Sequence, residues 1–458
     1  MAITASGIGS GIDIESLVTQ LVAAEADPVN SRLNLKETGL DAELSAYGTL
    51  KSALTAFQTS VTKLESAEDS FQVYTASSSD ETVFTAAAGS SAVAGDYSIE
   101  VVQLAQAAKL RSGDFTDSSE VIGTGTLDIS LGADSFQLTI DGTNNTLAGI
   151  RDAINAASDN PGITASLINV DSGTQLVLSS NQVGAANTVT VAAVDDDALD
   201  GFDLTRLDSV NLATQQGALD AIINVDSQLV TRSSNSFSDV IAGVTFNLAN
   251  TNIGETEILS VVTDITTVKE NIESFVTNYN TLVGVMKGLS NYDESTGVSG
   301  ALNGDSVVRG IQGQLREALF AGVSGGTFST LSELGITLDD TGSLEVEDTV
   351  LDEALSSNLS AVASFFSSTN GLAQSFTTAL SGYVDSDGII ENRQDSIQNR
   401  LDDIDDDRDT LTRRMASLEA RLSAQFIAMD ILVAQLQSTG DFLTSQLANL
   451  PSPNSIGN

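Results

Sequence analysis

Apolar residues repeat with helical spacing near both ends of the chain. Between Leu40 and Leu64 they stand three or four positions apart, which is a heptad pattern with one irregular step. A second heptad seam runs from Ile397 to Leu436. Such a helix cannot bury its apolar stripe alone, so we expect the two terminal helices to pair with each other or with another chain.

The predicted coiled-coil seams contain one charged side chain. The seam positions are Leu44, Leu54, Val61, Ile397, Leu401, Ile404, Arg408, Leu411, Met415, Leu418 and Leu422. Arg408 occupies a polar slot of this register, and a polar residue inside a seam can specify the partner helix or its alignment. The aspartates and arginines around it, between residues 393 and 421, are explained more simply as a solvated, ion-paired helix face.

The chain begins with a small, glycine-rich segment that cannot add to a core. A short helical face starting at Ile14 follows it. We expect that helix to stop at Asp27, which would cap a second helix with Pro28 at its first position. The glycines do not form a phosphate-binding loop, because no strand precedes them and no Lys-Ser or Lys-Thr pair follows.

From about Phe71 the apolar period changes to two, which is typical of strands. The predicted strands are residues 82–85, 97–101, 125–131, 135–141, 163–170, 175–179, 188–194, 221–225, 227–232, 243–249 and 257–262. One helix, residues 146–158, interrupts them, another starts at Asp264, and residues 336–346 are expected to form a hairpin. We therefore predict an α+β multidomain fold with heptad coiled-coil helices at both termini.

The composition removes most kinds of catalytic site. The 458 residues include no Cys and no His, so disulfides, thiol nucleophiles and histidine acid–base catalysis are excluded. Residues 385–388 begin like a calcium loop, but the Gly stands too early and Ile389 occupies a ligand position, which favours a turn. We predict no enzyme activity, no metal site and no cofactor.

Charge separates this chain from proteins that bind nucleic acid or anionic lipid. It has 19 basic and 62 acidic residues, a net charge of −43, and such a surface repels phosphate groups. The many acidic side chains also repel one another. Salt screens this repulsion, which suggests a saline habitat. No stretch reaches the roughly 18 apolar residues of a membrane span, and residues 1–13 do not resemble a cleaved secretory signal. We expect no nucleic-acid partner and no membrane insertion.

The opening segment contains a run of small, acidic and apolar residues with Ser6, Gly7, Gly9, Gly11, Asp13, Glu15 and Leu17. This run closely resembles the start of the flagellar hook-associated protein 2 family, the filament cap proteins. Segments at residues 145–155, 230–235 with 239–246, 334–337, and 424–430 with 446–447 are similar to parts of the same family, in the same order.

That resemblance implies a division into domains. Residues 1–70 would form an N-terminal export segment and leg helices, and residues 386–458 a C-terminal leg helix and tail. Residues 71–105 and 263–385 would be the two parts of a leg-proximal domain with helices and a small sheet. Residues 106–262 would form a β-rich head of two small domains.

The resemblance also implies a function. Several copies would assemble as a ring or plate at the filament tip, where exported flagellin folds and inserts beneath them. The implied partners are further copies of the chain, flagellin, hook–filament junction proteins and an export chaperone. The implied location is the extracellular tip of the flagellum, reached through the flagellar type III apparatus without a cleaved signal peptide.

Two other functions stay open from the sequence. A filament or hook-junction structural subunit would share the coiled-coil ends and the absence of Cys, although the terminal motifs of such subunits are missing here. A glycan-binding adhesin would use the β-rich middle, and adhesion to host surfaces also fits as a second role of a cap.

Overall fold

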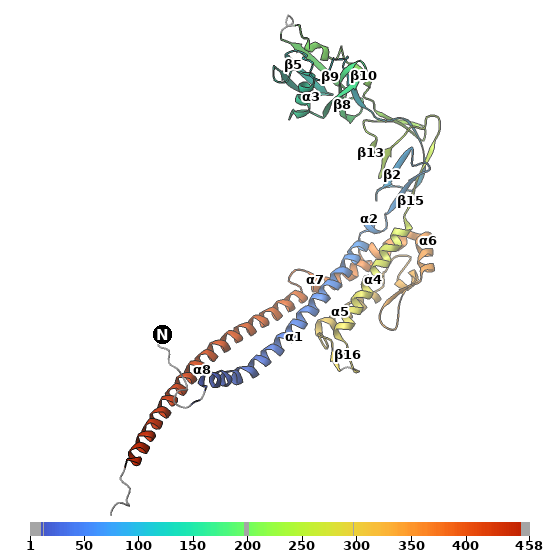
Figure 1. Cartoon of the computed structure of the whole chain (residues 1–458). Coiled ribbons are helices and arrows are strands. Elements are labelled where there is room, and N and C mark those ends of the chain that lie inside the picture. The colour runs from blue at the N-terminus through green and yellow to red at the C-terminus, as the bar shows by residue number, and fades with distance from the viewer. Residues whose placement is uncertain (1–10, 12, 197–200, 296, 450–458) are drawn as a thin grey trace, which may run out of the picture. The chain divides into compact units, whose positions relative to one another are not determined.

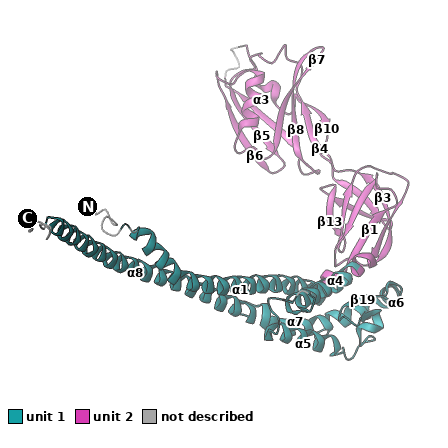
Figure 2. Ribbon diagram, turned by 60° about the horizontal axis from the view of Figure 1, so that its bottom comes forward, with its two compact units in different colours: residues 1–66, 270–458 teal, residues 67–269 magenta. Residues whose placement is uncertain are grey.

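The structure of the chain is a computed structural model that describes residues 11, 13–196, 201–295 and 297–449. The chain divides into two compact units (Figure 2). Residues 1–66 and 270–458 form one, called the helical unit here, and residues 67–269 form the other, called the β-rich unit. Long helices at both ends and antiparallel sheets between them confirm the predicted α+β multidomain fold.

Helices dominate the helical unit (Figure 1). They are α1 (Ile14–Glu65), α4 (Ile265–Ser290, whose first residues belong to the β-rich unit), α5 (Ser306–Phe320), α6 (Asp348–Ser367), α7 (Leu372–Val384) and α8 (Ile389–Ala448). Two hairpins and a 3-10 turn connect them: β16–β17 (Tyr292–Asp293 and Val298–Ser299), β18–β19 (Ile336–Leu338 and Leu344–Val346) and η2 (Leu331–Leu334). The second hairpin confirms the prediction for residues 336–346, whereas the sequence pattern did not predict α7.

The first long helix, α1, has 52 residues without a break, so the predicted stop at Asp27 is wrong. Asp13 caps its first turn by accepting the N–H of Ser16 at 3.0 Å. Pro28 lies inside the helix, where it removes one intrahelical hydrogen bond and favours a kink. Ion pairs to α8 on both sides of Pro28, from Glu25 and from Glu37, show that packing against α8 continues through this point.

Aromatic rings join α1, α4 and α7 inside the helical unit. The ring centroids of Phe57, Phe275 and Phe376 lie 5.3–5.6 Å from one another, and all three side chains are buried. Tilted and edge-on ring pairs of this kind add to the stabilisation that apolar burial provides. This cluster therefore fixes the C-terminal part of α1 against the helices from the second half of the chain.

A polar contact ties α1 to the start of α5. The hydroxyl of Tyr47 donates to Oδ2 of Asp305 at 2.8 Å, and Oδ1 of Asp305 accepts the N–H of Val307 at 2.7 Å as the N-cap of α5. Burial raises the pKa of Tyr47, with a further contribution from Asp305, so its hydroxyl stays protonated and able to donate.

The β-rich unit contains two hydrophobic cores. The first collects side chains from a five-stranded sheet of order β1-β15-β3-β11-β12 and a three-stranded sheet of order β13-β14-β2. These strands are β1 (Tyr74–Ser78), β2 (Phe84–Ala88), β3 (Gly95–Gln103), β11 (Ala221–Val225), β12 (Gln228–Arg232), β13 (Ser236–Ile241), β14 (Val244–Leu248) and β15 (Glu257–Thr263). The short helix α2 (Ala67–Ser70) precedes them.

The second core collects side chains from a four-stranded sheet of order β10-β4-β8-β7, a three-stranded sheet of order β6-β5-β9 and one helix. These elements are β4 (Ala107–Arg111), β5 (Gly125–Leu131), β6 (Asp134–Ile140), α3 (Leu147–Ala156), β7 (Ile163–Val170), β8 (Gly173–Val183), β9 (Val189–Asp195), η1 (Leu204–Leu207) and β10 (Ala213–Gln216). The predicted bounds of β5, β7 and β11 are confirmed without change.

Residues 71–105 belong to the β-rich unit, which corrects their predicted grouping with residues 263–385. Strand β1 pairs with β15, β2 with β14, and β3 with both β11 and β15. All of these partners come from residues 221–263, so ladders of backbone hydrogen bonds tie residues 71–105 to the middle of the chain. The other predicted domain boundaries stay predictions.

Aspartate side chains close many of the loops by the same local motif. In Asp-x-Thr and Asp-x-Ser segments the carboxylate accepts both the backbone N–H and the hydroxyl of the residue two positions later. Segments of this kind begin at Asp80, Asp117, Asp141, Asp203, Asp293 and Asp339. Part of the acidic excess is therefore used in turns.

The turn of the β18–β19 hairpin offers a test with a neighbouring control. Oδ1 of Asp339 accepts N–H bonds from Ser343 and Thr341, both at 2.8 Å, and these bonds hold the pKa of Asp339 below its ordinary value of 3.8. We expect Asp339→Ala to lower the melting temperature at neutral pH, whereas Asp340→Ala, at an exposed neighbour, should change it little. Circular dichroism melts of both variants provide the measurement.

The pH dependence of this effect has a defined sign. Because the folded pKa is depressed, the stabilisation from Asp339 is fully present above the unfolded value and is lost as pH falls through the folded value. The gap between wild type and Asp339→Ala should therefore close in acid. A gap that stays constant down to the lowest pH would contradict this account of the turn.

Candidate assembly interface on the terminal helices

The two terminal helices pack side by side in antiparallel directions. Among the described residues, cross-helix ion pairs join Glu25 to Arg414 at 3.1 Å, Glu37 to Arg408, and Lys51 to Glu391 at 3.5 Å. As residue numbers rise along α1, those of the partners fall along α8. The prediction that the terminal helices pair with each other is thus confirmed within a single chain.

The apolar seam between α1 and α8 differs in extent from the predicted one. On α8, Ile397, Ile404, Leu411 and Met415 are buried, while Leu401, Leu418 and Leu422 are half-buried. On α1, Ile14, Val18 and Leu33 are buried as well, before the predicted stripe that starts at Leu40. The predicted stripe did not extend to them, because Pro28 was expected to begin a new helix.

Two predicted seam residues do not face α8. Lys51 already lies opposite Glu391, close to the first residue of α8, so Leu54 and Val61 lie beyond the end of that helix. Both are completely buried, in the stretch of α1 whose Phe57 packs against α4 and α7. Leu44, earlier on α1, is half-buried. The apolar stripe from Leu40 to Leu64 thus serves two different partners.

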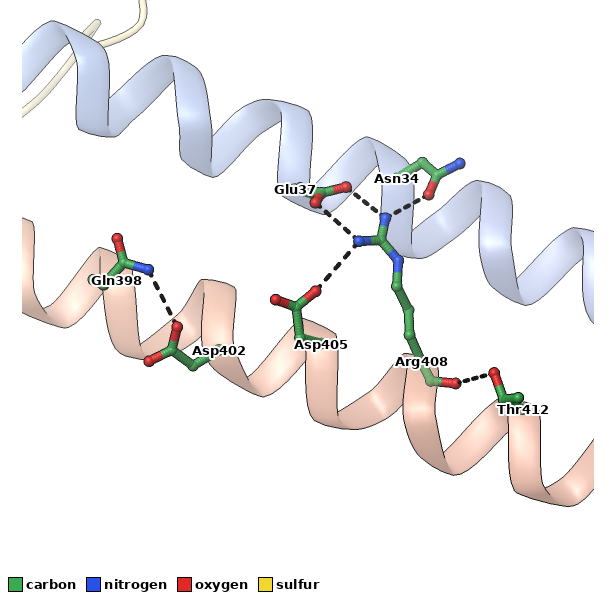
Figure 3. A network of polar contacts seen from close by, with 7 residues as sticks. All are labelled: Asn34, Glu37, Gln398, Asp402, Asp405, Arg408 and Thr412. Carbon is green, nitrogen blue, oxygen red and sulfur yellow. Dashed lines mark hydrogen bonds and ion pairs between the residues drawn. The ribbon is translucent and has the colours of Figure 1, made fainter.

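Arg408 lies across the seam and binds the opposite helix (Figure 3). Its guanidinium donates to both carboxylate oxygens of Glu37, with Nη1 to Oε1 at 2.9 Å, and to Oδ1 of Asn34 at 2.6 Å. Asp405, one turn earlier on α8, lies 3.5 Å from Nη1. The hydrogen bond from Arg408 lowers the pKa of Glu37. Because a bidentate pair requires one alignment of two helices, this network can fix their register, as the sequence suggested.

The N-terminal motif lies only partly inside the described residues. Ser6, Gly7 and Gly9 fall outside them. Gly11 precedes the helix with a φ of 74°, a left-handed conformation that glycine adopts without strain. Asp13 caps α1. Glu15 lies in the first turn, where its negative charge is stabilised by the positive end of the helix dipole. Leu17 is half-buried.

The seam on α8 continues beyond its partner. Ile14, the first residue of α1, lies 11, 23 and 37 residues before Glu25, Glu37 and Lys51, so these ion pairs place the start of α1 opposite residues 425 to 431 of α8. From there α8 runs on for roughly 26–35 Å to Ala448 at 1.5 Å per residue. Figure 1 shows this red end of α8 extending past the dark blue end of α1. We call residues 426–448 the overhang; Asp430 within it is buried.

The overhang exposes an apolar face. Seven of its large apolar side chains are 43% to 66% exposed: Met429, Ile431, Leu432, Leu436, Phe442, Leu443 and Leu447. Soluble proteins scatter such residues singly, whereas a continuous set along one helix marks an interaction surface. Spacing of three and four between Met429, Leu432 and Leu436 makes this face a continuation of the coiled-coil seam.

Other kinds of site find little support in the part of the chain that the structure describes. Within that part, no group of three or more acidic side chains is arranged to hold a metal ion. No helix described here is long and apolar enough to cross a membrane. The terminal helices form an antiparallel pair, and the apolar seam of α8 continues beyond the start of α1.

Comparison with known proteins identifies the family. The chain matches the family description "Flagellar hook-associated protein 2 N-terminus" at residues 10–108, "Flagellar hook-associated protein 2 C-terminus" at residues 218–438, and "Flagellin hook IN motif" at residues 126–182. The chain belongs to the flagellar hook-associated protein 2 family. The resemblance noted in the opening residues is thereby confirmed.

Individual relatives cover nearly the whole chain. The B-type flagellar hook-associated protein 2 of Pseudomonas aeruginosa and the flagellar hook-associated protein 2 of Escherichia coli K12 are each 34% identical, with 98% of both chains covered. A crystal structure of the flagellar cap protein FliD, domains D1-D2-D3, from Escherichia coli is similar with a TM-score of 0.65 and 33% identity. It covers 77% of this chain and 99% of its own. The prediction of a filament cap protein is therefore confirmed, and the alternatives of a filament subunit or adhesin are not favoured.

Two substitutions on α8 separate folding from assembly. Ile404→Asp places a carboxylate in the buried seam against α1, where losing the side chain alone costs about 2–5 kcal/mol. We expect earlier melting of the helical signal in circular dichroism. Leu432→Asp, on the exposed overhang, should leave the melt of the isolated chain unchanged. Equal destabilisation by both changes would mean that the overhang is already covered within one chain.

Proposed function

We propose that this chain caps the flagellar filament by self-association at its tip, where it guides exported flagellin into place. Family membership over nearly the whole chain is the observation that carries this proposal. The overhang supplies a physical means, because a helix that continues its seam past its own partner needs another helix to cover that seam. We infer that helices of the filament subunits below the cap cover the overhang.

The partners follow from the same proposal. Copies of the chain would form the cap and flagellin would be the protein that it handles. Hook–filament junction proteins would be neighbours before filament growth, and an export chaperone would bind the chain inside the cell. The location would be the filament tip outside the cell. Adhesion to host surfaces receives no separate support from the described residues.

We also infer that the chain has no enzymatic activity. The absence of His and Cys and the structural role of the family support this inference. Turnover of glycans or peptides that disappears on changing one carboxylate would contradict it.

A double substitution on the overhang tests the capping role. In cells that lack the chain, we expect exported flagellin to escape into the medium and filaments to stay short. Wild-type chain should restore filaments, whereas Leu432→Asp with Leu436→Asp should not, although the protein folds and is exported. Leu229→Asp, at a comparably exposed leucine on β12, is the matched control and should restore growth. Full rescue by the double variant would remove the overhang from the capping mechanism.

Export can be tested separately. We infer that the first residues direct secretion through the flagellar apparatus. Deleting residues 2–12 leaves the Asp13 cap of α1 in place, so thermal melting should not change. Secretion measured in culture supernatants should fall sharply. Normal secretion of the shortened chain would show that the signal lies elsewhere.

A further inference from the structure

The helical unit contains an uncharged hollow of about 480 Å³ beside the β18–β19 hairpin. Its lining residues come from the end of α5, the turn η2 and the hairpin: Leu319, Phe320, Gly322, Thr330, Leu331, Ser332, Ile336, Thr337, Leu338 and Leu344. Leu331, Ile336 and Leu344 are buried, while Phe320 and Leu338 are 69% and 40% exposed. The hollow thus has an apolar floor and exposed apolar side chains at its mouth.

A second exposed apolar feature stands at the other end of α5. The β16–β17 hairpin leads into α5 and carries Tyr292 and Val298, both more than half exposed. Tyr292 pairs with Ser299, and Asp293 pairs with Val298, so the two apolar side chains point to opposite faces of the hairpin. Each face of the hairpin therefore carries one exposed apolar side chain, beside Ser299 on one face and Asp293 on the other.

One chain cannot bring these two features together. The hollow includes Leu319 and Phe320, the last residues of α5, whereas the hairpin precedes its first residue, Ser306. The 15 residues of α5 span about 22 Å. A hairpin that docked in the hollow would therefore come from a second molecule, and such a contact between two different surfaces repeats head to tail, closing into a ring where the rotation allows.

Charge favours a second copy of this chain as the occupant. At a net charge of −43, two copies repel one another, so their contact surfaces must be uncharged or of opposite sign. None of the ten lining residues is charged. A neighbouring hollow shares Leu319 and Leu338 with the first and is lined by the exposed Arg316. That arginine would lie near Asp293 and Glu294 of the entering hairpin.

We propose that the β16–β17 hairpin of one copy docks in the hollow of the next copy and forms the repeated contact of the cap. Tyr292 supplies the anchoring side chain, since aromatic residues buried in a pocket contribute most to such contacts. The proposal rests on the proposed self-association of the chain and adds to it the two surfaces that meet.

Cysteine cross-linking tests the contact directly, because the chain has no Cys of its own. Ser299→Cys lies beside Tyr292 on the hairpin, and Thr337→Cys lies in the lining of the hollow, so both keep the apolar side chains. The purified full chain is treated with a short thiol cross-linker near 1 M salt, where screening weakens repulsion between copies. Val194→Cys, an exposed site on β9, replaces Thr337→Cys in the control.

The expected pattern distinguishes a head-to-tail contact from other contacts. The double variant should give a ladder at multiples of the chain mass, whereas a mixture of the two single variants should stop at dimers. Tyr292→Ala added to the double variant should remove the ladder. Self-linking of either single variant, or equal linking of the control, would overturn the proposal.

Sedimentation of the same samples separates this proposal from the capping function. If the double variant sediments as an oligomer but gives no cross-linked products, the hairpin contact is wrong and the capping function still stands. A chain that neither sediments as an oligomer nor cross-links would also overturn the contact, and the capping role would then depend on the filament-growth experiment alone. Cross-linking of Thr337→Cys to added flagellin in preference to a second copy would show that the filament subunit fills the hollow.

Discussion

The mismatch between two paired helices is the constraint on which the rest of this structure depends. α1 has 52 residues and α8 has 60, yet α1 devotes its last turns to the core of the helical unit. Because Lys51 of α1 lies opposite Glu391 near the start of α8, the antiparallel pair reaches the first residue of α1 well before the last residue of α8. The aromatic cluster around Phe57 fixes one end of this arrangement, and the apolar overhang is its consequence at the other end.

Register decides how much of α8 is left over. Apolar heptads allow neighbouring alignments of similar energy, whereas the Arg408 guanidinium can meet Glu37 and Asn34 together in one alignment only. Both Arg408 and Glu37 are solvent-accessible, so their pair adds little to stability. The pair instead selects one alignment of α1 with α8. A slip of one helix by one heptad would lengthen or shorten the overhang by about 10 Å.

Local patterns in the sequence predicted the elements better than their partners. Strands such as β5 and β7 follow from alternation, and the β18–β19 hairpin follows from its Asp-rich turn. Pairing of β1 with β15 joins residues almost 190 positions apart, and no local pattern could reveal it. The uninterrupted α1 was missed for a related reason, since the packing that tolerates Pro28 comes from α8, at the other end of the chain.

In the candidate interface, too, the sequence predicted the residues better than their partners. Heptad spacing identified Ile397, Ile404 and Arg408 as seam residues, because their chemistry and spacing are visible in the sequence. It could not show that Leu54 is completely buried, or that Leu432 and Leu436 are more than half exposed. Those facts depend on where α1 begins and how far it runs along α8, which are lengths set by the whole fold.

The free energy available from the overhang indicates how a cap could hold on while remaining mobile. Complete burial of a large apolar side chain gives about 1.5–3 kcal/mol, so covering seven half-exposed ones gives about 7 kcal/mol in all. Association costs an estimated 4–15 kcal/mol, so one overhang binds weakly by itself. Several overhangs carried by one assembly bind together much more strongly, because each additional contact forms at a high effective concentration. In the proposed cap, single contacts would then open to admit a subunit while the others keep the assembly in place.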